Sequence, residues 1–345
     1  MSRARAEDTE PPHPRETAVL FGHADAERTL LEAYRAGRMP HAWIIGGPPG
    51  IGKATLAYRM ARFVLAHPDP AAADVQAARS LAVAEDHPAA RRMIAQAHSD
   101  LLVLERTAGP TGTLRTVITV EDVRRTIGFF GSTAGAGGWR LCIVDSADEL
   151  QSPQGANALL KVLEEPPARA LFLLVAHAPG RLLPTIRSRC RRLTMRPLDT
   201  ADVACAAAVA LGRDPDEADL RRAAGGAQGS VARAISLLGG PALAVRDRMI
   251  ELLGALPAVD PRALHALGDV LMRADDNVFE AFVDTVRDWL SAQLTTPPLE
   301  AARLAPVAEV WEKLDRAARD VEIFNLDRKP MVFAVFGLLA ETARR

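Results

Sequence analysis

Cysteine is scarce in this chain of 345 residues, with only Cys142, Cys190 and Cys205, and no two of them have CxxC spacing. The sequence therefore offers neither a disulfide framework nor a tetrahedral zinc set. Long apolar runs are also missing, because residues 170–176 fall far short of the roughly 18 that a membrane-spanning helix needs. The first residues lack the apolar segment of a signal peptide. We expect residues 1–17 to form a disordered tail and the protein to be cytoplasmic.

Lysine is rare as well, with only four lysines among 42 basic residues, and the net charge is −1. An overall charge so close to zero gives no indication of nucleic-acid binding. Hydrophobic residues make up 48% of the chain and charged residues 25%, which is typical of a globular protein. A length of 345 residues exceeds that of one ordinary core, so we expect two or three domains.

One of the few lysines ends a glycine-rich loop. A short apolar strand at residues 42–45 precedes residues 47–53, which fit the GxxxxGK pattern of a phosphate-binding loop, and a helix is predicted from Lys53 onward. The glycines let the backbone form a nest of N–H groups facing an anion, and the positive end of the helix adds to that field. The candidate nucleotide-binding residues are Gly47, Pro48, Pro49, Gly50, Ile51, Gly52, Lys53, Ala54, Thr55 and Asp145.

The loop lacks one group that catalysis requires. Ala54 occupies the position of the Ser or Thr whose hydroxyl holds Mg²⁺, and Thr55 is rotated about a quarter-turn further round the helix. The sequence therefore predicts the scaffold of a nucleotide site without its metal ligand. It leaves open whether the loop holds ATP or ADP without turning it over.

Strands and helices alternate after the loop, which is typical of an α/β fold with a parallel sheet. Asp145 is expected at the carboxyl end of a buried strand, where ligands of open α/β sheets bind and an acid commonly holds Mg²⁺. The strands are predicted at residues 101–104, 139–145 and 171–176, and the helices at residues 24–37, 119–130 and 157–165.

The pattern beyond Pro197 is helical throughout. The predicted division is a tail at residues 1–17, a core domain at 18–197, a small helical lid domain at 198–242 and an all-helical collar domain at 243–345. The collar is rich in Leu, Val and Phe but has no candidate site chemistry, so we expect it to carry subunit assembly.

Four motifs agree in order and spacing with one family. Residues 46–53, 141–149, the Leu-Leu-Lys-Val-Leu-Glu-Glu-Pro-Pro helix within 157–167, and Ser188-Arg189-Cys190 resemble the clamp-loader subunits of the AAA+ ATPase family in bacterial DNA polymerase III. The resemblance implies a P-loop AAA+ domain followed by a helical lid and a helical collar. It also implies a ring that places a sliding clamp on primer-template DNA. The implied partners are motor subunits of gamma/tau type, the delta subunit, the clamp and the DNA, with no membrane.

Departures from the motor subunits favour a largely non-hydrolysing stator of that ring. Besides Ala54, Ser146 follows Asp145 where active members carry a glutamate, and Ala232 is found where motors carry the lid arginine. The resemblance further implies that Arg189 acts in trans as an arginine finger on a neighbouring subunit. The four-cysteine zinc module that relatives often carry has no counterpart in residues 66–100, so no zinc is predicted.

Two other functions remain open. The chain could be an ATP-hydrolysing motor subunit of gamma/tau type or a related helicase loader, although Ala54 and Ser146 replace groups that phosphoryl transfer needs. It could also be an unrelated regulator that uses the phosphate loop as a nucleotide sensor. The Ser-Arg-Cys and Leu-Glu-Glu-Pro-Pro signatures separate the clamp-loader hypothesis from this last one.

Overall fold

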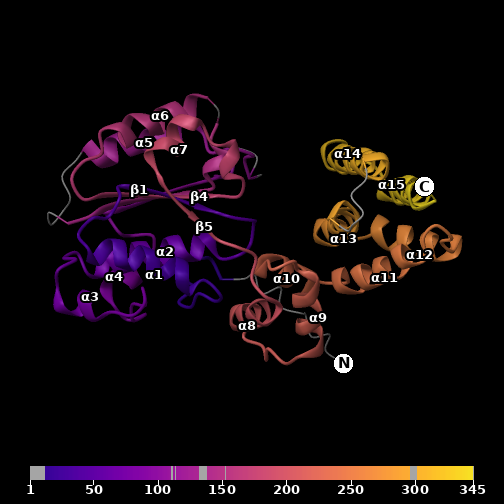
Figure 1. Ribbon diagram of the computed structural model, residues 1–345, viewed down its shortest axis with the longest axis horizontal. Coiled ribbons are helices and arrows are strands. Elements are labelled where there is room, and N and C mark those ends of the chain that lie inside the picture. The colour runs from indigo at the N-terminus through magenta and orange to yellow at the C-terminus, as the bar shows by residue number, and fades with distance from the viewer. Residues whose placement is uncertain are drawn as a thin grey trace. The chain divides into compact units, whose positions relative to one another are not determined.

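The computed structural model describes residues 12–109, 112, 114–131, 138–151, 153–295 and 301–344 (Figure 1). The chain divides into two compact units. The sheet unit consists of the described residues up to Glu217 together with Ala224–Ala232, and the helical unit consists of Ala218–Ala223 and the described residues from Arg233 onward. No helix in these described ranges has the length and apolar content that crossing a membrane requires.

The sheet unit is built on five parallel strands in the order β2-β3-β4-β1-β5. Gly46 pairs with Ala176 and Asp145 pairs with Val175, so the carboxyl ends of the three central strands lie at one edge. Every residue of β1 and β4 is buried, which requires cover on both faces of the sheet. The bounds are β1 (Ala42–Gly46), β2 (Leu101–Glu105), β3 (Arg140–Asp145), β4 (Ala170–Ala176) and β5 (Arg191–Thr194).

Helices cover the two faces of the sheet in separate groups, as Figure 1 shows. Because side chains alternate along a strand, Trp43 and Ile45 enter the core on one face while Ile44 enters the core on the other. The first face carries α1 (Ala24–Arg35), α2 (Lys53–Ala66), α3 (Ala73–Ala77) and α4 (Pro88–Ile94), and the second carries α5 (Val120–Gly131), α6 (Gln154–Glu164) and α7 (Pro184–Arg189). Two short 3₁₀ turns follow β3 and β4, namely η1 (Ala147–Glu149) and η2 (Pro179–Arg181).

The rest of the chain is helical. The sheet unit also contains α8, whereas α9 and α10 each contribute residues to both units. The helical unit has one core around Phe282, Leu314 and Phe336. The bounds are α8 (Thr200–Leu211), α9 (Ala218–Gly226), α10 (Val231–Leu238), α11 (Ala242–Gly254), α12 (Pro261–Met272), α13 (Asp276–Thr295), α14 (Ala301–Phe324) and α15 (Arg328–Ala343).

The predicted α/β class and helical C-terminal region are confirmed, but the edge strand β5 was not predicted. Two of its four residues are arginines and three of the four are exposed, so it lacks the apolar pattern of a strand. Residues 1–11 of the predicted tail lie outside the described residues. Residues 12–17 lie against α2, where Arg62 donates a hydrogen bond to the carbonyl oxygen of Arg15 (2.6 Å). The division into tail, core, lid and collar domains stays a prediction.

Candidate functional site

The predicted phosphate loop joins β1 to α2 at the carboxyl edge of the sheet. Gly50 and Gly52 have φ angles of 73° and 96°, a left-handed conformation that a side chain would strain. Lys53 begins α2, and Ala54 packs against the apolar core on that face. The strand, the glycine turn and the helix therefore occur at the residues where the sequence predicted them.

A second segment of the sheet unit lies directly against this loop. The backbone N–H of Val231 donates a hydrogen bond to the carbonyl oxygen of Gly50 (2.8 Å). A Cβ atom at Gly50 would lie 2.1 Å from Ser230 Oγ and 2.8 Å from the Cβ of Ala232. At the position where the family resemblance implies a lid arginine in motors, the methyl group of Ala232 thus packs close to the loop.

Lys53 is buried in the loop that it follows. Its side chain is only 3% exposed, and Nζ donates a hydrogen bond to the carbonyl oxygen of Pro48 (2.5 Å). Burial lowers the pKa of Lys53 to about 8, although the nearby carboxylates of Asp145 and Asp148 act in the opposite direction. The structure therefore places Lys53 close enough to Asp145 for the two charges to interact, and the assignment of a nucleotide site stays a prediction.

The acid-tipped strand ends in a carboxylate and a buried hydroxyl. Burial raises the pKa of Asp145, Glu105 raises it further, and Lys53 lowers it. Ser146 is 3% exposed, and a hydrogen bond of 2.8 Å joins its Oγ to Nε2 of His177 at the end of β4. Desolvation lowers the pKa of His177. A neutral Ser–His pair therefore occupies the place where the resemblance implies a water-positioning glutamate in active members.

Asp148 has a role that the sequence did not reveal. Asp148 and Glu149 lie in the 3₁₀ turn η1. The Asp148 carboxylate accepts hydrogen bonds from the backbone N–H groups of His177 and Ala178, both at 3.0 Å. Glu149 forms an ion pair with Arg106 at 2.9 Å. Asp148 therefore holds the segment after β4 against the end of β3, a long-range contact with no local sequence signal.

Arg189 lies on a different element from the loop. It is the last residue of α7, and its side chain is 35% exposed. Its NH1 donates to the carbonyl oxygen of Thr185 (3.0 Å), and its NH2 forms an ion pair with Glu164 Oε1 (2.7 Å). These contacts are with α6 and α7, so Arg189 belongs to a separate candidate site.

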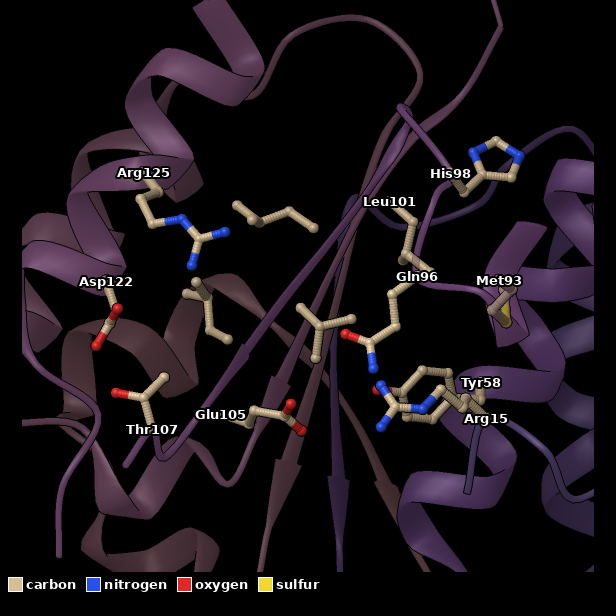
Figure 2. A pocket seen from close by; sticks show the side chains of 13 residues that line it. Arg15, Tyr58, Met93, Gln96, His98, Leu101, Glu105, Thr107, Asp122 and Arg125 are labelled. Carbon is tan, nitrogen blue, oxygen red and sulfur yellow. The ribbon is translucent and has the colours of Figure 1, made fainter. Parts of the chain in front are cut away.

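A cavity of about 230 Å³ lies along the outer edge of β2 (Figure 2). Arg125 reaches it from α5 on one side, while Tyr58, Arg15 and Gln96 line it on the other. Its lining includes no residue of the phosphate loop. The cavity is therefore distinct from the predicted nucleotide site.

The strand order β2-β3-β4-β1-β5, with a phosphate loop after β1 and an acid at the end of β3, defines an AAA+ P-loop protein. A family model described as "DNA polymerase III, delta subunit" matches residues 22–199. The chain belongs to this DNA polymerase III family, and its curated relatives place it with the delta′ subunits.

Two of those relatives are named DNA polymerase III subunit delta′. The one from Escherichia coli is 31% identical over 71% of this chain and 72% of its own length. The one from Pseudomonas aeruginosa is 39% identical over 44% of this chain and 41% of its own length. The match thus spans less than half of the Pseudomonas protein. The description of the family model reads delta where these relatives read delta′, and the Escherichia coli match supports delta′ over most of both chains.

More distant similarities reach other proteins. A gamma/tau subunit of DNA polymerase III from Mycobacterium tuberculosis is 30% identical over 54% of this chain and 29% of its own length. A solved gamma-subunit-related protein from Thermotoga maritima has 18% identity and a TM-score of 0.43, covering 92% of this chain and all of that one. The fold class rests on the strand order and loop described above.

Proposed function

We propose that this chain is a delta′-type subunit of the DNA polymerase III clamp loader that acts as a largely non-hydrolysing stator. In this proposal it works in the cytoplasm with gamma/tau-type motor subunits and the delta subunit to load the sliding clamp on primed DNA. It donates Arg189 to the ATP site of a neighbouring motor subunit.

The observation that carries the proposal is a phosphate loop that has the expected backbone conformation but lacks the side-chain groups that phosphoryl transfer needs. Ala54 has no hydroxyl for Mg²⁺, and the hydroxyl of Ser146 is engaged with His177. These residues do not fit a catalytic metal site, whose metal neutralises the charge that develops on the phosphates. Within the described part of the chain no group of three or more His, Cys, Asp or Glu side chains could hold a metal ion.

The chemistry of Arg189 supports the second half of the proposal. A guanidinium is always charged, and its fork of donors matches phosphate oxygens. Its partial exposure at the end of α7 leaves it accessible to a neighbour. An arginine finger is worth about 10³–10⁵ in rate at its own site.

ATP hydrolysis by the chain alone and by its mixture with a gamma/tau-type subunit tests this function. We expect negligible hydrolysis by the chain alone and no change with Lys53→Ala. In the mixture, Arg189→Ala should lower turnover and clamp loading without preventing assembly, and Arg189→Lys should rescue only part of the loss because an ammonium lacks the fork. Arg192→Ala removes an exposed arginine from β5 and is the control. Wild-type loading rates with both Arg189 variants would contradict the proposal.

The similarity to gamma/tau subunits favours a second candidate, a working motor ATPase. The same assay separates the two functions. Hydrolysis by the isolated chain that Lys53→Ala abolishes would establish the motor and overturn the stator.

A further inference from the structure

The ion pair between Glu164 and Arg189 bridges two helices that are fixed by a common core. Glu164 is the last residue of α6 and Arg189 is the last residue of α7. Leu163 directly precedes Glu164, and Ile186 lies three residues before Arg189. Both are 1% exposed and belong to the same apolar cluster. The backbones that carry the two charges are therefore held in place, and the 2.7 Å contact between them constrains the side chains.

The position of Glu164 is unusual for a carboxylate. The carboxyl end of a helix carries partial negative charge, so Lys, Arg or His is favoured there and Glu is disfavoured. Here α6 ends in Glu164, Glu165 follows at the cap, and Pro166 prevents the helix from continuing. A cation at Glu164 offsets this unfavourable placement, and Arg189 supplies it.

The contact leaves most of the Arg189 fork unused. NH2 faces Glu164 and NH1 faces the carbonyl oxygen of Thr185. Within the described part of the chain, the Nε–H and a second N–H on each terminal nitrogen remain for another acceptor, because a guanidinium has donors on all three nitrogens. The contacts with Glu164 and with the carbonyl oxygen of Thr185 thus fix the plane of the guanidinium and leave other N–H donors available.

We propose that Glu164 is a positioning residue for the Arg189 finger. This inference rests on the proposed function, since it concerns how Arg189 is presented to phosphate on a neighbouring subunit. Glu164 holds the guanidinium in one orientation before assembly, so the neighbour's site does not have to order a freely rotating side chain. Exposed ion pairs are worth up to about 1 kcal/mol, so loss of the anchor should lower the finger-dependent rate about two- to five-fold.

The test uses the full chain mixed with the gamma/tau-type subunit. The measured quantity is the finger-dependent rate, defined as the wild-type turnover minus that of Arg189→Ala. Glu164→Ala should lower this rate about two- to five-fold with the KM for ATP unchanged, and Glu164→Gln should lie between it and wild type. Glu165→Ala removes the neighbouring exposed carboxylate and should have no effect. In the Arg189→Ala background, Glu164→Ala should also have no effect, because the pair acts as one unit.

The outcomes separate this inference from the proposed function. If Arg189→Ala leaves turnover unchanged, the finger itself fails and the role of Glu164 fails with it. If Arg189→Ala lowers turnover but Glu164→Ala leaves or raises the finger-dependent rate, only the positioning role is overturned. An equal loss with Glu165→Ala, or a loss that persists without Arg189, would show a general effect on the end of α6 instead. Thermal unfolding of each variant verifies that the chain remains folded.

Discussion

The side-chain nitrogen of Lys53 lies 2.5 Å from the carbonyl oxygen of Pro48, five residues earlier in the same loop. The cation that a phosphate loop offers to nucleotide is therefore bonded to the loop's own backbone. Its side chain is almost fully buried, which lowers its pKa to about 8. Keeping Lys53 charged at neutral pH costs the folded state free energy.

This burial predicts a pH-dependent stability. Between pH 8 and about 10.5 the unfolded chain binds more protons at Lys53 than the folded chain does, so the free energy of unfolding should rise with pH. Relative to Lys53→Met, wild type should gain about 2–3 kcal/mol over this interval. Urea unfolding at several pH values measures it. Lys161→Met removes an exposed lysine from α6 and should follow the wild-type profile, whereas a flat difference between wild type and Lys53→Met would contradict the burial argument.

Gly50 should not tolerate a side chain. A Cβ there would meet Ser230 and Ala232, and the positive φ is itself unfavourable for alanine. Gly50→Ala should lower the free energy of unfolding by about 1–3 kcal/mol and accelerate hydrogen exchange at the Val231 N–H. Gly180→Ala, at a glycine with open space around it, should change stability by less than about 0.5 kcal/mol. Equal stabilities for the two variants would contradict the close approach at Gly50.

Asp148 should matter for stability although it is not expected to catalyse. Asp148→Ala leaves the N–H groups of His177 and Ala178 without their acceptor, at an expected cost of about 1–3 kcal/mol. Thermal unfolding measures this change. The control is Asp25→Ala on α1, whose side chain is 96% exposed and should contribute about 0.5 kcal/mol or less. A neutral Asp148→Ala would show that the segment after β4 is held by other contacts.

The helical unit exposes apolar side chains where α14 ends. Ile323 is 70% exposed, Phe324 is 66% exposed and Leu326 is 51% exposed. Such clusters are typical of protein interaction sites, so replacing Ile323 and Phe324 by serine should reduce co-elution with gamma/tau-type subunits about ten-fold or more while leaving the chain folded. Val209→Ser, at a 60% exposed residue of α8, is the control. Unchanged co-elution would exclude this cluster as the assembly surface.

Local patterns were sufficient for the loop, the acid-tipped strand and most helices, because glycine spacing and apolar periodicity act over a few residues. These local patterns could not predict contacts between segments that are distant in the sequence. Asp148 and His177 are 29 residues apart, and Ser146 and His177 are 31 apart. The strand β5 could not be predicted from its apolar pattern, because its edge position lets arginines replace apolar residues. The guanidinium carbon of Arg191 lies 5.0 Å from the centre of the Trp43 ring.

The chain passes between its two units three times within a short stretch, after Glu217, after Ala223 and after Ala232. Two of these crossings lie inside the continuous helices α9 and α10. A single protease cut therefore cannot separate the two units cleanly. A cut after Glu217 leaves Ala224–Ala232 of the sheet unit on the helical fragment, and a cut after Ala232 leaves Ala218–Ala223 of the helical unit on the sheet fragment. A gene fragment encoding residues 1–242 would likewise include part of the helical core, because Ala223 and Leu237 are buried members of it.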